Sequence, residues 1–147
     1  LSARALPGGL VVIGAPLVED YDDPAVAAGH VLAARVRADA VDPLQAVLET
    51  GGVAVTLRFL TSGSLPDSVL AAHAREMLAT PAPRPETAGL ISAFADAGVP
   101  ATPYARALDL TGESTAALRA ADPIAPEAVV PLLPDGPWVA LQNICSA

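Results

Sequence analysis

The sequence contains no lysine, and all eight of its basic side chains are arginine. This absence excludes mechanisms that need a lysine: a Schiff base, a lysine general base and the lysine of a phosphate-binding P-loop. The exclusive use of arginine is typical of a GC-rich bacterial genome.

Aromatic residues and cysteine are also scarce, with one tryptophan, two tyrosines, two phenylalanines and one cysteine. We therefore expect a core of Val, Leu, Ile and Ala, which suits close packing of helices on a sheet. The single cysteine, Cys145, excludes an intramolecular disulfide and a cysteine-rich metal site. We expect Cys145 to be a buried, inert thiol in a cytoplasmic protein.

Long apolar runs and clusters of basic charge are missing too. The run from Leu10 to Val18 is interrupted by Gly14 and Pro16, and it is shorter than the roughly 18 residues of a membrane-spanning helix. The net charge is −8 and the arginines are scattered. Binding to phosphate groups draws on clustered basic side chains, so the charge argues against nucleic acid and anionic membrane surfaces as partners.

The length of 147 residues fits one domain with one core. Because the chain begins with Leu1 rather than methionine, we expect it to be a fragment of a longer chain or a processed one.

Strands and helices are predicted to alternate along the chain. β-branched and alternating apolar patterns predict strands at 10–13, 53–60, 104–108 and 138–144. Capping residues and apolar spacing predict helices at 24–39, 43–50, 66–80, 86–97, 111–121 and 127–132, the second of them ended by Gly51 and Gly52. This order predicts a single α/β domain over 1–147: a three-layer sandwich with a mostly parallel, flavodoxin-like sheet. The alternative is an α+β domain whose last strand pairs antiparallel at an edge.

The first candidate site is the loop Thr61, Ser62, Gly63 and Ser64, which lies between a predicted strand and a predicted helix. In a parallel sheet, ligands bind where strands end and the unpaired amides of a helix N-terminus point outward. The loop resembles the Thr/Ser/Gly phosphate loops of flavodoxin-like proteins over these four residues. It is predicted to bind a phosphate or carboxylate; the alternative is an ordinary turn with a hydroxyl cap.

Tyr104 and Arg106 form a second candidate, because alternate residues of a strand share one side. A phenol and a guanidinium on that side could line a pocket for an anionic ligand. In the alternative interpretation, Arg106 forms a salt bridge with Asp109.

Asp20 and Asp22 lie in an acidic loop after the first predicted strand and are the weaker candidates, for a Mg²⁺ ion. The alternative is a solvated loop in which Asp23 caps the next helix. His30 and His73 share predicted helix faces with apolar residues, which favours core or interface positions over a general base. Their separation fits no metal-binding motif.

Two classes of function remain open at this stage. In the first, which the crevice expected of a parallel sheet favours, the domain binds a small anionic metabolite at the strand ends and could act on it as an enzyme or enzyme subunit. In the second, the alternative, it is a non-catalytic interaction or assembly subunit, forming a homo-oligomer or a larger assembly through its Ala-rich helices and its terminal strand. The sequence assigns no reaction and no cofactor.

Overall fold

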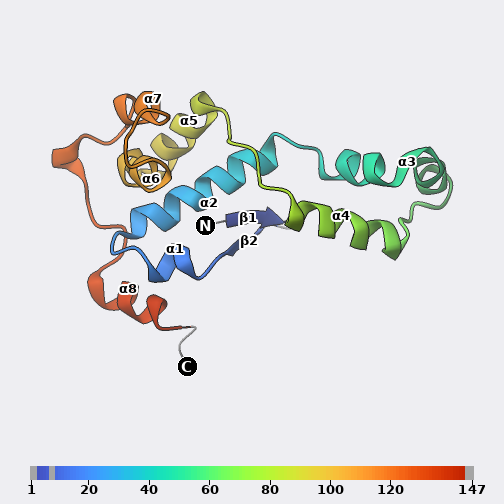
Figure 1. The fold of residues 1–147 in the computed structure, drawn as a ribbon, viewed down its shortest axis with the longest axis horizontal. Helices are drawn as coiled ribbons and strands as arrows, with labels where there is room; N and C mark the ends of the chain where they lie inside the picture. Colours follow the sequence, from blue (N-terminus) through green and yellow to red (C-terminus); the bar gives the residue numbers. More distant parts are fainter. Residues whose placement is uncertain (1–2, 7–8, 145–147) are drawn as a thin grey trace. The chain divides into compact units, whose positions relative to one another are not determined.

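The computed structural model describes residues 3–6 and 9–144. It is mostly helical, at 63%, with one two-stranded antiparallel sheet (Figure 1). The predicted three-layer sandwich with a mostly parallel sheet is therefore wrong. The α+β alternative fails as well, because its antiparallel edge strand at 138–144 lies mainly in a helix.

The chain divides into two compact units. We call residues 1–36 and 85–147 the body and residues 37–84 the arm. The body contains strands β1 (Ala3–Leu6) and β2 (Leu10–Ile13), helices α1 (Pro16–Glu19), α2 (Pro24–Asp39, whose last turn belongs to the arm), α5 (Thr87–Ala97), α6 (Ala101–Leu108), α7 (Ala116–Ala120) and α8 (Asp135–Gln142), and the 3₁₀ turn η1 (Pro126–Ala128). The arm contains α3 (Pro43–Ser62) and α4 (Asp67–Ala79).

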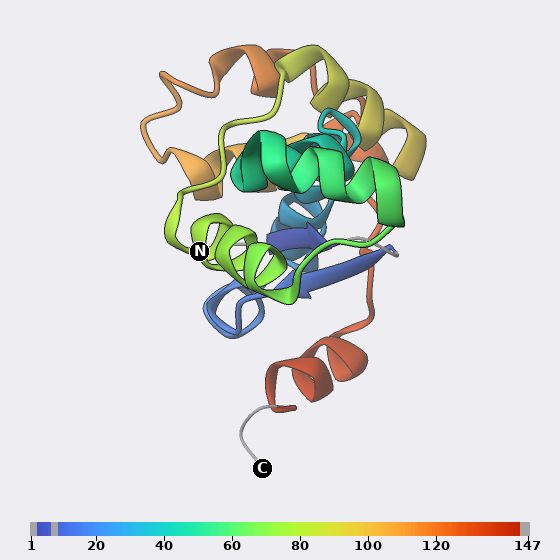
Figure 2. The ribbon, with the colours of Figure 1, turned by 90° about the vertical axis from the view of Figure 1, so that its right-hand side faces the viewer.

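The predicted strand at 10–13 is confirmed as β2, but it is not a buried strand. It pairs antiparallel with β1, with Ala3 opposite Ile13 and Leu6 opposite Leu10, and the two strands lie side by side in Figure 2. Leu10 and Ile13 are exposed. A two-stranded sheet of this size forms only a small core. Ala3 of β1 packs with Leu17 of α1 and Ala34 of α2.

Helix α2 begins as the sequence predicts. The Asp23 carboxylate accepts a hydrogen bond from the Ala25 amide at 2.8 Å, and Pro24 occupies the first helical position. Both features satisfy or remove amides that a helix N-terminus leaves unpaired.

The main core of the body joins α2, α5, α6 and α7. It contains Ala33, Leu90, Phe94, Tyr104 and Leu118, together with smaller buried residues. The rings of Phe94 and Tyr104 are 5.7 Å apart between centroids. Phe94 and Leu17, the latter in a smaller cluster under the hairpin, are the largest fully buried side chains.

Helix α8 is held against the turn after α1. Trp138 Nε1 donates to the carbonyl of Tyr21 at 3.3 Å, and Gln142 Nε2 donates to the carbonyls of Val18 and Tyr21, both at 3.1 Å. Trp138 and Gln142 are four residues apart, so a helix puts them on one face. In a strand the two residues would lie about 13 Å apart, too far for both side chains to reach the carbonyl of Tyr21.

The helices predicted at 24–39, 66–80 and 86–97 are confirmed as α2, α4 and α5, with Gly98 ending α5 in the left-handed region at φ 63°. The strands predicted at 53–60, 104–108 and 138–144 are wrong, because these segments fall mainly in α3, α6 and α8. The helix predicted at 43–50 continues past its expected stop into the rest of α3. The last two predicted helices are shortened to α7 and η1.

Asp122 fixes the start of α6. Its carboxylate accepts hydrogen bonds from the amides of Ala101, Thr102 and Ile124 at 3.1, 2.7 and 3.0 Å. Partial burial by itself raises the pKa of this carboxyl, but the hydrogen bonds outweigh it and hold the pKa below its ordinary value. Asp122 thus supplies the cap that the N-cap residue Pro100 lacks.

Asp122→Ala is expected to lower the free energy of unfolding by about 1 kcal/mol at pH 7. A native pKa held below 3.8 stabilises the fold above about pH 4, and this contribution is lost as the pH falls further. The variant should therefore differ from the wild type less at pH 3 than at pH 7 in urea unfolding. Asp22→Ala, at an exposed carboxyl, is the control; an equal loss there would contradict the capping role.

Candidate functional site

The arm is an apolar helical hairpin without a buried residue. Helices α3 and α4 lie side by side in Figure 1, and no residue of either helix is buried. Large aliphatic side chains of the arm are exposed instead: Val41, Leu44, Val53, Leu57, Leu60, Leu70 and Leu78. The exposed fractions reach 77% at Val53 and 73% at Leu60.

The first half of α3 begins at a local capping signal. Asp42 accepts hydrogen bonds from the amides of Leu44 and Gln45 at 2.8 and 3.2 Å, and Pro43 takes the first helical position. This is the same Asp-Pro start that opens α2.

A glycine bends α3 in the middle. Gly52 has φ 72° and ψ −173°, a conformation open almost only to glycine, and the helix resumes in a new direction after it. The sequence indicated a stop at Gly51 and Gly52. In the structure the residues after Gly52 form helix again, so this pair produces a kink within α3 rather than its end.

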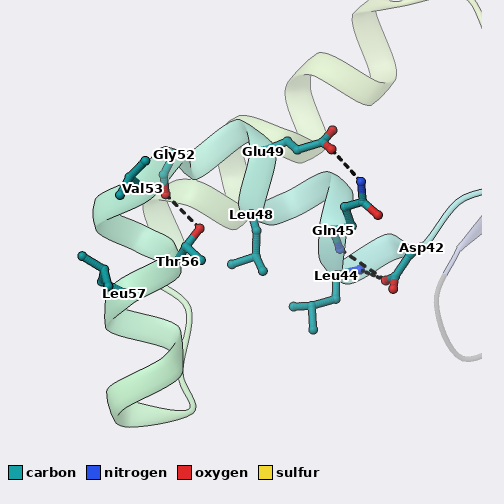
Figure 3. Close-up of a pocket in the computed structure, with 9 residues that line it drawn as sticks. All are labelled: Asp42, Leu44, Gln45, Leu48, Glu49, Gly52, Val53, Thr56 and Leu57. Carbon is teal, nitrogen blue, oxygen red and sulfur yellow. Dashed lines mark hydrogen bonds between the residues drawn. The ribbon is translucent and has the colours of Figure 1, made fainter.

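The bend creates a groove of about 500 Å³. It is lined by Asp42, Leu44, Gln45, Leu48, Glu49, Gly52, Val53, Thr56 and Leu57 (Figure 3). Figure 3 shows Leu44 and Leu48 projecting side by side from the first segment of the helix. Both segments of α3 contribute to the lining, so the groove lies at the kink.

The polar groups of the groove are engaged within the helix. Gln45 Nε2 donates to Glu49 Oε1 at 2.8 Å, and the Thr56 hydroxyl donates to the Gly52 carbonyl at 3.1 Å (Figure 3). Asp42 is committed to its cap. Asp42 and Glu49 each use one carboxylate oxygen in these bonds, and the rest of the lining is dominated by the side chains of Leu44, Leu48, Val53 and Leu57, which favours an apolar ligand over a polar metabolite.

His73 joins the two helices of the arm. Its Nδ1 lies 3.0 Å from the Thr50 hydroxyl, and that hydroxyl donates to the Ala46 carbonyl at 3.1 Å. The tautomer of His73 decides which of the two atoms donates in this hydrogen bond. His73 therefore has a positioning role between α3 and α4.

The predicted anion loop lies at the end of a helix rather than at the start of one. Thr61 and Ser62 form the last turn of α3, where their hydroxyls donate to the carbonyls of Leu57 and Arg58 at 3.0 and 2.7 Å. Gly63 is the left-handed C-cap, and Ser64 lies 3.0 Å from Ser62 between hydroxyl oxygens. In the described chain a helix rather than a strand precedes this loop, and the end of a helix carries partial negative charge, which disfavours an anion.

The structure separates Tyr104 and Arg106. Both belong to α6, where residues two apart point to nearly opposite sides. Tyr104 is buried in the body core, edge-on to His30 with ring centroids 4.9 Å apart, whereas Arg106 is exposed. They do not line a common pocket.

Asp109, the proposed partner of Arg106, serves the loop between α6 and α7. Its carboxylate accepts hydrogen bonds from the hydroxyl and amide of Thr111 at 2.6 and 2.9 Å, and from those of Ser114 at 2.8 and 2.9 Å. The Thr111 hydroxyl contributes most to lowering the pKa of Asp109, followed by Ser114. The loop before α7 is thereby fixed in place.

Asp20 caps the C-terminal end of α1, and Asp22 is exposed in the turn after it. Within residues 3–6 and 9–144, no three His, Cys, Asp or Glu side chains gather closely enough to hold a metal ion. Cys145 lies outside the described residues. No helix in the described part of the chain is long and apolar enough to cross a membrane.

The exposed apolar face of the arm was not predicted from the sequence. The signal was present in α3, whose 20 residues include only two charged side chains, Glu49 and Arg58. A helix with so little charge needs a covering surface if it is to bury its apolar residues. Comparison with family models, with curated proteins and with solved structures finds no match to this chain.

Proposed function

We propose that this protein is a non-catalytic assembly subunit whose arm binds another protein chain through the apolar face of α3. The observation that carries the proposal is the absence of any buried residue in α3 and α4 together with the large aliphatic side chains that they expose. Contiguous exposed apolar surface of this kind marks protein interaction sites.

The energetics of the arm support the same proposal. Full burial of one Leu or Val side chain stabilises a structure by about 1.5 to 3 kcal/mol, and the arm gains little of this from its own fold. Short helices in water are marginal without tertiary packing. A partner that covers Val53, Leu57 and Leu60 would supply the missing burial.

The chemistry of the groove favours binding over catalysis. Its polar side chains make capping and intrahelical hydrogen bonds, and the side chains between them are apolar. The anionic-metabolite hypothesis rested on strand ends and a helix N-terminus at Thr61 to Ser64, and the helix C-terminus found there gives it no support. The assembly hypothesis is therefore the better supported of the two.

Photo-crosslinking in cells tests the proposal. A photo-reactive side chain at position 57 of the full chain is expected to give one discrete protein adduct, and the same group at position 110 of the body none. Leu110 is the matched control, since it is also an exposed leucine. The purified partner must then bind the wild type and lose at least tenfold in affinity for Leu57→Asp. Equal labelling from both positions, or unchanged affinity, would overturn the proposal.

A further inference from the structure

We infer that the partner of the arm is a second copy of this chain, joined through α3 about a two-fold axis at the Gly52 kink. This inference rests on the proposed function and adds the identity of the partner. The distribution of charge over the molecule is its first support.

The arm is nearly neutral on a strongly acidic chain. Residues 37–84 contain four arginines and five carboxylates, for a net charge of −1, and the whole chain carries −8, which leaves −7 on the remainder. Two copies that approach through their bodies repel each other, whereas two arms meet with little repulsion. A basic partner would be drawn to the body instead. The arm thus fits a partner surface of low net charge with exposed aliphatic side chains, and a second arm has that character.

The two charges of α3 are placed for self-complementarity. Glu49 lies before the kink and Arg58 after it, and Val53 lies close to the midpoint between them. A two-fold contact is the same patch on both subunits, so residue i meets residue j and j meets i. A two-fold axis at the kink brings Glu49 of each copy toward Arg58 of the other, which makes two equivalent charge pairs.

Both charges are available for this contact. Glu49 accepts one hydrogen bond, from Gln45, and Arg58 forms no ion pair within the described part of the chain. Val53, which is 77% exposed, lies beside the axis. Leu57, which is 59% exposed, lies in the segment of α3 that would contact the groove of the other copy. The apolar side chains then supply affinity and the charge pairs fix the register.

Sedimentation velocity of the full chain between 1 and 100 µM (about two decades, spanning a micromolar dissociation constant) tests the inference. We expect a dimer of twice 14.7 kDa. Glu49→Arg and Arg58→Glu should each raise the dissociation constant at least tenfold, since each places like charges opposite one another. The double variant should return to within threefold of the wild type. Leu57→Asp should be monomeric, and Leu110→Asp, the control in the body, should remain a dimer.

Each alternative result has a distinct meaning. A monomeric wild type overturns the inference; the proposed function then stands if position 57 still crosslinks to a different protein and falls if it does not. A dimer that survives Leu57→Asp overturns both the inference and the role of the arm in self-association. Loss of the dimer in both charge variants without recovery in the double variant overturns the axis at the kink. Helical circular dichroism of each variant confirms that it is folded.

Discussion

Gly29→Ala is expected to lower the free energy of unfolding of the body by about 2 to 3 kcal/mol, because α2 and α6 leave no room for a methyl group. A Cβ at position 29 would overlap the Cβ of Tyr104. Real Cβ atoms do not approach this closely, so α6 would have to move. Such a shift would disturb the ring contacts of Tyr104 with His30 and Phe94.

Gly89→Ala is the matched control for this substitution. Gly89 is also inside a helix, but its added Cβ would meet the nearest atom, Cγ1 of Val36, at 3.4 Å, close to ordinary contact. The gain in helix propensity, about 0.5 to 1 kcal/mol for glycine to alanine, should leave this variant neutral or more stable. Urea unfolding followed by the fluorescence of Trp138, the only tryptophan, measures both variants. Equal effects of the two would contradict the close approach of α2 and α6.

Helix ends in this protein could be predicted from the sequence because they depend on local chemistry. The pair Asp23 and Pro24 opens α2, and Gly98 closes α5 with a left-handed cap. A cap is formed by residues within one turn of the helix end, so the residues that decide it are adjacent in the sequence.

Strands could not be predicted in the same way, because a strand requires a neighbour. The segment 53–60 alternates in hydrophobicity, but Ala54 and Leu60 make its second face apolar too, so its period was ambiguous. Only β1 and β2 pair within the described chain, and 53–60 has no strand beside it. For α6, the spacing of Ala101, Tyr104 and Ala105 is the helical pattern that sequence reasoning overlooked.

The candidate site could be predicted only in part. The Gly51–Gly52 pair predicted the end of a helix, whereas the structure has a kink at Gly52 and a second helical segment after it. Whether a glycine pair leads into a loop or into a second helical segment depends on packing between α3 and α4, including the contact of Thr50 with His73. The exposure of the α3 face is a three-dimensional property and cannot be derived from its apolar composition alone.

Phe94→Ala is expected to be the most damaging single truncation, costing about 3 to 5 kcal/mol of unfolding free energy. Phe94 has no exposed surface and packs against Tyr104 in the main core, so its removal forfeits burial and leaves a cavity. Leu110→Ala, at a side chain that is 92% exposed, should change stability by less than about 0.5 kcal/mol. A loss below about 1 kcal/mol for Phe94→Ala would contradict its place in a close-packed core.

Urea unfolding of Phe94→Ala also tests whether the body unfolds as one unit. Trp138 is buried on α8 and bonded to the turn after α1, whereas Phe94 lies in the cluster formed by α2, α5, α6 and α7. Because α2 contributes Ala34 to the smaller cluster and Ala33 to the main one, we expect the two clusters to be coupled through it. The Trp138 transition should therefore shift to lower urea by the full cost of Phe94→Ala. An unshifted Trp138 transition beside an early loss of helical circular dichroism would show that the two clusters unfold independently.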